Sequence, residues 1–240
     1  MSFKKTRLGV NIDHFATLRN QREEVYIDLG FVAKILKKCE VSNITIHLRE
    51  DRRHIKDLDL RNLVKLNILP INLEMAPTNE MLDICKDVKP SSCCLVPEKR
   101  SELTTEGGLN IKDNYSIISS ILKEVRKNTK TSLFIEPDIE QIKFAVKLGV
   151  NAVEIHTGKY AKLFELGEHT QELENITRAA NYAKNRGIDV HAGHGLNLEN
   201  VKNIIDIETV SELNIGYSIV VQSLFSGINN VIERYKKLME

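Results

Sequence analysis

The sequence has few aromatic side chains and almost no net charge, and both shortages narrow the range of possible functions. Aromatic residues make up 5% of its 240 residues, so the chain lacks an aromatic binding platform. The formal net charge of +1 creates no global field that would hold nucleic acid or an anionic membrane. Any anion must therefore be bound locally, and we expect small molecules as partners.

Cysteine pairs and long apolar runs are also missing. The four cysteines, Cys39, Cys85, Cys93 and Cys94, show no CxxC spacing, and consecutive residues of a strand point to opposite faces. No apolar run is long enough to span a membrane. The first residues, MSFKKTRLGVNIDH, lead into a short apolar strand without the features of a secretory signal. We expect reduced thiols and a cytoplasmic protein.

What the chain does contain is a regular alternation of short apolar runs with segments of helical periodicity. Strands are predicted to begin at Leu8, Asn43, Ile71, Ser92, Thr131, Ala152, Asp189 and Glu212. Helices are predicted over Ile27–Lys38, Leu58–Leu66, Asn79–Lys86, Ser116–Asn128, Ile139–Leu148, Leu173–Arg186, Leu198–Ile205 and Val231–Leu238. Gly149 is expected to end the fifth of these helices.

Eight such units in a chain of this length predict a (β/α)₈ barrel, a TIM barrel with additional helices. No linker rich in serine, proline or glycine divides the chain, so we expect one domain over residues 1–240. A doubly wound open sheet is the competing fold. It is disfavoured because no GxGxxG motif follows the first strand.

Chemically active side chains gather where the predicted strands end, which is where such barrels place their active sites. Six of the seven histidines are expected near this face, with His169 as the exception. Glu74 and Glu154 alternate with apolar neighbours and should point into the barrel mouth. Together these groups could supply several proton donors and acceptors near neutral pH. A structural histidine, or a carboxylate neutralised by an arginine, is the plainer alternative at each position.

A phosphate site is predicted after the seventh and eighth strands, where Gly193-His194-Gly195 and Asn214-Ile215-Gly216 allow close backbone approach. Tight turns would explain the same glycines. The arginines that could clamp a second anion are Arg22, Arg49, Arg52, Arg53 and Arg100, although Leu48–His54 also resembles a solvated loop. The loop around Thr104–Gly108 is a candidate lid.

Eight motifs in order and spacing resemble the pyridoxine 5′-phosphate synthase family of vitamin B6 biosynthesis. They are GVNIDHFATLRNQR, TIHLREDRRHI, NLEMA, CCLVPEKR, TTEGGLN, EIHTG, AGHGLN and ELNIG, and they run from Gly9 to about Gly216. The resemblance implies a (β/α)₈ barrel that condenses 1-deoxy-D-xylulose 5-phosphate with 3-amino-2-oxopropyl phosphate, without a cofactor or metal. It further implies a homo-octamer assembled as a tetramer of dimers.

The resemblance also implies roles for individual residues. His47 and Glu74 correspond to proton acceptors, His194 to a proton donor, and Glu154 to a residue that stabilises charged transition states. Deoxyxylulose phosphate would be held by Asp13, His14, Arg49, His54 and Thr104. The amino-ketone phosphate would be held by Asn11, Arg22, Gly195 and Gly216. We expect the segment from Glu98 to Gly108 to close over the site.

One departure from the family pattern lies after the eighth strand. The family commonly continues there as Gly-His and then a Gly-Arg pair, whereas this chain has Gly216-Tyr217 and later Val221-Gln222. The backbone donor at Gly216 is retained, and Tyr217 can still offer a hydroxyl to the substrate.

Three other functions compete with this interpretation. In a metal-dependent hydrolase or aldolase, the ligands would come from His156, His191, His194 and Glu154. A Schiff-base aldolase is disfavoured because Glu154 stands where many such barrels carry lysine. A noncatalytic phosphate-binding barrel would bind both substrates without turnover.

Overall fold

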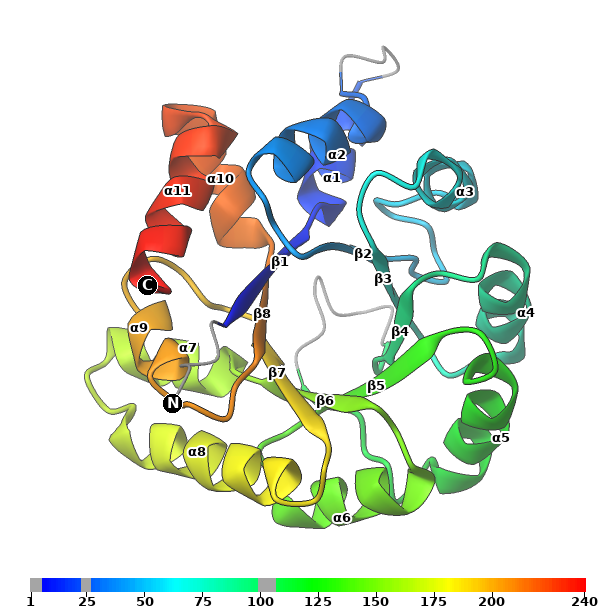
Figure 1. Cartoon of the computed structure of the whole chain (residues 1–240), viewed down its shortest axis with the longest axis vertical. Coiled ribbons are helices and arrows are strands. Elements are labelled where there is room, and N and C mark those ends of the chain that lie inside the picture. Colours follow the sequence, from blue (N-terminus) through cyan, green and yellow to red (C-terminus); the bar gives the residue numbers. More distant parts are fainter. Residues whose placement is uncertain (1–5, 23–26, 99–106) are drawn as a thin grey trace.

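A computed structural model describes residues 6–22, 27–98 and 107–240. Eight parallel strands form a closed barrel in sequence order, and a ring of helices surrounds them (Figure 1). The strands are β1 (Arg7–Asn11), β2 (Asn43–His47), β3 (Ile71–Met75), β4 (Ser92–Leu95), β5 (Lys130–Ile135), β6 (Ala152–His156), β7 (Asp189–Gly193) and β8 (Glu212–Ile215). The predicted barrel is confirmed, with every strand beginning within one residue of its expected position.

The described residues contain more helices than the sequence predicts. They are α1 (Asp13–Asn20), α2 (Leu29–Lys38), α3 (Asp57–Leu66), α4 (Asn79–Val88), α5 (Tyr115–Val125), α6 (Ile139–Leu148), α7 (Gly158–Glu165), α8 (Thr170–Lys184), α9 (Val201–Ile205), α10 (Tyr217–Ser226) and α11 (Ile228–Leu238). Helix α6 has its predicted bounds and ends at Gly149 in a left-handed conformation, with φ +66°. No described helix is long and apolar enough to cross a membrane.

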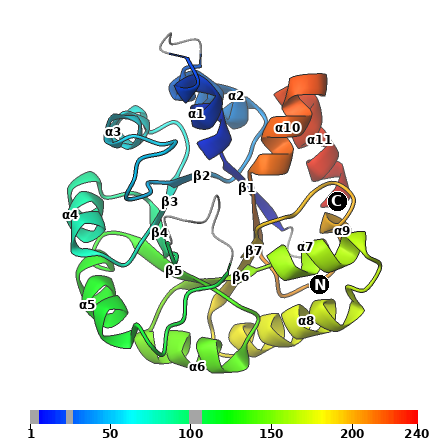
Figure 2. The same cartoon turned by 180° about the vertical axis from the view of Figure 1, so that it is seen from behind.

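Three helices, α1, α7 and α10, have no counterpart in the prediction. Each begins two residues after a strand ends, so its first turn consists of residues that we assigned to active-site loops. In α1, only Asp13 and Ala16 are buried, which leaves too short an apolar stripe to signal a helix. Figure 2, which views the barrel from behind, shows the three helices around one end of it. Their amino termini bring backbone N–H groups to the carboxyl ends of the strands.

The strands alternate between apolar residues that face the helices and polar residues that face the barrel axis. In β2, Ile44 and Ile46 belong to the main hydrophobic core, while Thr45 contacts Asn214 of β8 at 3.3 Å. Asn72 of β3 in turn donates a hydrogen bond to Thr45 at 3.3 Å. Hydrogen-bonded polar side chains therefore fill part of the barrel interior, since buried polar groups need partners.

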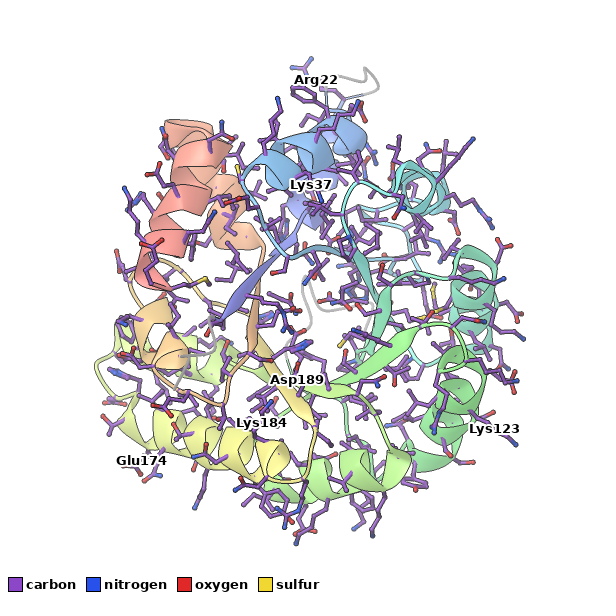
Figure 3. All side chains as sticks on the ribbon, viewed as in Figure 1. Arg22, Lys37, Lys123, Glu174, Lys184 and Asp189 are labelled. Atoms are coloured by element: carbon purple, nitrogen blue, oxygen red, sulfur yellow. The ribbon has the colours of Figure 1, made fainter. Side chains whose placement is uncertain are left out.

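Ion pairs close the amino-terminal end of the barrel. Arg7 of β1 lies 2.9 Å from Glu212 of β8 and 3.4 Å from Asp189 of β7. Lys184 at the end of α8 reaches Asp189 at 3.1 Å from outside the barrel, and Figure 3 labels both residues. The Glu212 side chain is only 8% exposed, and Arg7 supplies a cationic partner for this buried carboxylate.

We expect Arg7→Met to lower the free energy of unfolding by about 1 to 2 kcal/mol and to leave turnover unchanged. The variant leaves the Glu212 carboxylate short of a partner, but Arg7 is itself 41% exposed, which limits the loss. Lys184→Met is the control, because its more exposed pair should contribute less than about 0.5 kcal/mol. Urea denaturation measures both. In such barrels one end contributes to stability and the other carries the active site. Equal losses of unfolding free energy in the two variants, or reduced turnover in Arg7→Met, would contradict this division of roles.

Candidate active site

A cavity of about 680 Å³ opens at the carboxyl ends of the strands, a volume suited to small-molecule substrates. Its walls include most of the residues that the sequence singled out: Asn11, Asp13, His14, His47, Arg49, His54, Glu74, Glu154, His194, Gly195, Gly216 and Tyr217. Residues far apart in the sequence thus meet in one space, because all eight parallel strands end on the same side of the barrel.

Of the predicted site residues, Thr104 lies outside the described residues, as does the clamp candidate Arg100. Arg22 is exposed in the turn after α1, and Figure 3 shows it at the outer edge of the molecule. Arg22 is therefore not placed to contact a phosphate bound in the cavity of its own chain. The cause is helix α1, which leads the chain outward from the end of β1.

Of the other clamp arginines, only Arg49 reaches the cavity, where it is almost fully buried. Arg52 forms ion pairs with Asp57 at 3.0 Å and Glu80 at 2.5 Å. Arg53 pairs with Asp51 at 2.6 Å. The segment after β2 thus divides into one arginine that can face an anion and two that join surface carboxylates.

Asp13 links the first two strands at the cavity wall. Its carboxylate accepts hydrogen bonds from the backbone N–H of His47 at 2.9 Å and from the side-chain amide of Asn11 at 3.0 Å. The ring of His54 lies 4.0 Å away. Burial lowers the pKa of His54 although the charge of Asp13 opposes it, so His54 is mainly neutral at pH 7. Nδ1 of this neutral ring accepts the backbone N–H of Ile55 at 3.0 Å, which leaves its Nε2–H to donate a hydrogen bond to a substrate oxygen.

His47 lies between two carboxylates. Its Nε2 is 2.8 Å from Glu98 and its Nδ1 is 3.8 Å from Glu74. Glu98 also accepts a hydrogen bond from the backbone N–H of Glu50 at 3.1 Å. Burial is the largest influence and would raise the pKa of Glu98, but the contacts with His47, the backbone N–H of Glu50 and the charge of Arg49 together outweigh it and hold the pKa below its ordinary value. Glu98 is therefore ionised at neutral pH.

Glu74 and Glu154, two glutamates that line the cavity, have unusually high proton affinity. Removal from bulk water raises the pKa of Glu74 well above its ordinary value, and the nearby charges of Glu154 and Asp13 add to the effect. Burial raises the pKa of Glu154 to about 7, against the opposing hydrogen bond that Asn214 donates at 2.6 Å. Glu154 can consequently exchange protons near neutral pH, and Glu74 holds its proton to higher pH than an exposed carboxylate does.

His194 stands across the cavity in a cluster of rings. Its ring centre lies 4.9 Å from that of His156 and 6.5 Å from that of Phe134. Burial, followed by the influence of His156, lowers the pKa of His194 to about 4, so the free site holds it neutral. Its backbone has φ +82°, a conformation that the hydroxyl of Thr157 supports by donating to the His194 carbonyl at 2.7 Å.

Glycine is required at two positions of the expected phosphate site. Gly195 has φ +75°, and Gly216 packs so closely on Asn11 that an added Cβ would lie 2.8 Å from the Cβ of Asn11. Helix α10 begins directly after Gly216, so its first N–H groups face the cavity. Tyr217 is 67% exposed at this rim, and its ring meets the edge of His14 at 5.1 Å.

His191 corrects the expectation that six histidines share this end of the barrel. Its ring lies 3.5 Å from Glu212 and 3.9 Å from Asp189, the first residues of β8 and β7. His191 is the register partner of Glu154 on the adjacent strand β6, but unlike Glu154 and His194 it does not line the cavity. In residues 6–22, 27–98 and 107–240, no three His, Cys, Asp or Glu side chains are grouped as metal ligands.

Sequence reasoning overlooked two carboxylates that bind histidines. Glu98 was considered only as part of a closing segment, and Glu136 was not considered although its carboxylate lies 2.9 Å from Nδ1 of His156. Both follow a strand by one to three residues, which is the signal that could have identified them. Segment 99–106 of the expected lid is outside the described residues. Gly108 beyond it donates its N–H to Glu136 at 2.7 Å.

The barrel and its mouth together define a class: an enzyme of the (β/α)₈ type with buried acid-base groups around one cavity. The model of the pyridoxal phosphate biosynthesis protein PdxJ family matches residues 8–240. The chain belongs to this family.

Named relatives agree over nearly the full length. A pyridoxine 5′-phosphate synthase of Sulfurihydrogenibium sp. strain YO3AOP1 is 46% identical over 238 residues, covering 97% of both chains. The enzyme of the same name from Wolbachia pipientis subsp. Culex pipiens is 47% identical and covers 96% of this chain and 97% of its own.

Similar solved structures extend the fold to other barrels. Phosphoribosyl anthranilate isomerase of Thermotoga maritima aligns with a TM-score of 0.60 at 12% identity over 98% of both chains. The isomerase of the same name from Thermus thermophilus aligns with a TM-score of 0.57 at 11% identity over the same share. At these identities the likeness concerns the fold alone.

We expect Glu74→Gln to lower kcat by roughly two to four decades while preserving the fold, because the amide keeps the shape of the side chain and removes its basicity. The pH dependence of the free energy of unfolding provides a second test of the role of Glu74. The raised pKa of Glu74 means that the wild type loses stability as pH rises through that pKa, and the variant should escape this loss.

The glutamine variant should therefore gain in unfolding free energy relative to the wild type between pH 5 and pH 8. Steady-state kinetics and urea denaturation at both pH values provide the test. Wild-type kcat in the variant would show that Glu74 is dispensable for the chemistry.

Proposed function

We propose that this chain condenses 1-deoxy-D-xylulose 5-phosphate with 3-amino-2-oxopropyl phosphate to give pyridoxine 5′-phosphate, inorganic phosphate and water. The observation that carries the proposal is the convergence of Glu74, Glu154, His47 and His194 around one cavity. Imine formation, enolisation, phosphate loss and ring closure each move protons at fixed positions, and these side chains supply groups of different acidity.

Proton acceptance is assigned to His47 and Glu74. The raised pKa of Glu74 makes its carboxylate a stronger base than an exposed one, and it faces the same space as His47. Glu154 lies deeper, where its negative charge stabilises cationic iminium species formed from the amine and the ketone. Because burial raises the pKa of Glu154 to about 7, it can also take up a proton when such charge disappears.

Proton donation is assigned to His194, which must first become protonated. Its pKa of about 4 leaves the ring neutral in the free site. A phosphate dianion bound beside Gly195 would stabilise the imidazolium form and raise this pKa. The donor is then charged only when substrate is present, and its imidazolium can give a proton to a departing phosphate or hydroxyl group.

Two anion sites accompany these groups. The amino-ketone phosphate is assigned to the backbone of Gly195 and Gly216, the start of α10 and the amide of Asn11. The deoxyxylulose phosphate is assigned to Arg49, His54, His14, Asp13 and Thr104, where guanidinium and imidazole groups face the phosphate and hydroxyls. Arg22 of the same chain is not part of this assignment because it lies outside the cavity.

Mixing the purified chain with both phosphorylated substrates tests the proposal directly. Pyridoxine 5′-phosphate and inorganic phosphate should appear in equal amounts, as detected by mass spectrometry and a phosphate assay. Calorimetric binding of both substrates without product formation would instead indicate a noncatalytic phosphate-binding barrel.

The departure at Tyr217 generates a further prediction. We expect Tyr217→His to tighten amino-ketone phosphate binding at pH 6 by up to about fivefold, or about 1 kcal/mol, and to change it little at pH 8. A protonated imidazole adds charge to the site, but the exposure of this position screens it.

Calorimetry on both proteins at matched ionic strength measures this difference, and Tyr217→Phe controls for loss of the hydroxyl. Phosphate protonation changes in the same pH range and cancels between the proteins. Equal affinities at pH 6 would assign binding at this rim to the Gly216 backbone alone.

We also assign the chain to the cytoplasm and to a homo-octamer built as a tetramer of dimers. In support, its four cysteines are unpaired, and large apolar side chains are exposed on neighbouring helices. Phe225 and Leu224 at the end of α10 are 86% and 64% exposed, and Phe31 on α2 is 59% exposed. Solvent contact at such residues is unfavourable, so a subunit interface would stabilise them.

Phe225→Asp should therefore dissociate the assembly into smaller species, as measured by light scattering coupled to size-exclusion chromatography. Leu166→Asp is the control, because Leu166 is similarly exposed at 69% but follows α7 on another side of the barrel. A monomeric wild type, or assembly unaffected by Phe225→Asp, would contradict the assignment of this surface.

A further inference from the structure

The contacts of His47 distinguish its two ring nitrogens. Nε2 meets a carboxylate oxygen of Glu98 at 2.8 Å, which is a hydrogen-bond length, whereas Nδ1 is 3.8 Å from the nearest oxygen of Glu74. The Glu98 side chain is 4% exposed and that of His47 is 6% exposed. The first contact is therefore shielded from water, which strengthens it relative to an exposed pair.

Glu98 is itself fixed in orientation. One oxygen faces His47, and the other accepts the backbone N–H of Glu50 at 3.1 Å. An ionised carboxylate is only an acceptor, so the hydrogen on His47 must lie on Nε2 when the ring is neutral. Nδ1 is then the basic nitrogen of the ring.

The remaining contact of His47 directs that basic nitrogen toward the cavity. At 3.8 Å, Nδ1 and the Glu74 carboxylate are too far apart to hydrogen-bond to each other, and both groups line the cavity. Because Nδ1 and the Glu74 carboxylate do not hydrogen-bond to each other, both can act on the same substrate. The backbone N–H of His47 is held by Asp13 at 2.9 Å, which limits movement of the strand end.

We propose that Glu98 is a positioning residue for His47, which holds the hydrogen on Nε2 so that Nδ1 is the nitrogen that accepts protons from the substrate. The kinetic part of this proposal rests on the proposed function, whereas the tautomer does not. Glu98 does not need to touch substrate, since it acts through His47. A carboxylate behind a histidine raises the basicity of the ring and fixes its orientation.

Other charged groups also face His47 and must be considered in any pH dependence. They come from β3, α1 and the segment after β2, and they are Glu74, Asp13, Arg49 and His54. Substitution of Glu98 leaves all of them in place. A difference between the kcat–pH profiles of the wild type and a Glu98 variant therefore reports the effect of the Glu98 charge.

The kinetic test compares Glu98→Gln with Glu98→Asp. In the glutamine variant, kcat should fall about 10²-fold with KM changed less than about threefold, because the amide can turn and donate to Nε2, which reverses the tautomer. Loss of the negative charge should also disfavour protonation beside it and move the acidic limb of the kcat profile to lower pH. Glu98→Asp keeps the charge, so its limb should stay in place and part of kcat should return.

Glu172→Gln is the matched control. The Glu172 side chain is also 4% exposed and bound to a cation, Lys159, at 2.7 Å, but it lies in α8 away from the cavity. Any loss of activity that follows from neutralising a buried carboxylate should appear in both variants. Unchanged kcat and an unmoved acidic limb in Glu98→Gln would overturn the proposal, as would an equal loss of kcat in Glu172→Gln.

A measurement without substrate separates this proposal from the proposed function. Nitrogen-15 spectra of histidine-labelled full-length protein at pH 8, with His47→Gln for assignment, should show Nε2 protonated and Nδ1 unprotonated in the wild type. Glu98→Gln should show a mixture or the reverse. A wild-type ring protonated on Nδ1 would overturn the positioning role. Absence of pyridoxine 5′-phosphate formation alongside the expected tautomer would instead refute the proposed function alone.

Discussion

Removal of ionisable side chains from water at the mouth of the barrel governs most of the other features of this protein. A carboxylate or imidazolium loses hydration when buried, so its neutral form is favoured unless a partner stabilises the charge. Glu74 and Glu154 keep protons to higher pH for this reason, and His194 loses its proton at lower pH. Glu98 escapes the rule because His47 and a backbone N–H bind its charge.

The same constraint explains the polar interior of the barrel. Asn214 donates to Glu154 from β8, and Thr45 and Asn72 extend the contacts across β2 and β3. A purely aliphatic interior would leave Glu74 and Glu154 without hydrogen-bond partners. At the opposite end of the barrel, Arg7 stabilises Glu212, so strand closure and charge compensation are achieved by one contact.

Short helices after β1, β6 and β8 add a different kind of electrostatic support. The amino termini of α1 and α10 present N–H groups at the cavity, which favours anions without a large positive net charge. A nearly neutral chain can in this way favour the close approach of an anion at one place while the rest of its surface carries balanced charge. The glycines at 195 and 216 permit this approach, because side chains there would meet Ala161 and Asn11.

Much of this organisation follows from the sequence. Period and length identify the eight strands, because apolar and polar side chains must alternate between helix layer and barrel interior. The same alternation placed Glu74 and Glu154 at the cavity. The same alternation wrongly predicted that His191 lies at the cavity. It shows which face of a strand a residue occupies, but it does not show the layer of the barrel interior in which the residue lies.

The sequence by itself determined the barrel, the order of its strands and the kinds of side chain that end them. Only the tertiary structure decided which of these side chains meet. It paired Glu98 with His47 and directed Arg22 outward. The physical reason is that hydrogen bonds and ion pairs act over a few ångströms between residues distant in the chain, whereas periodicity records only which side of its own element a residue faces.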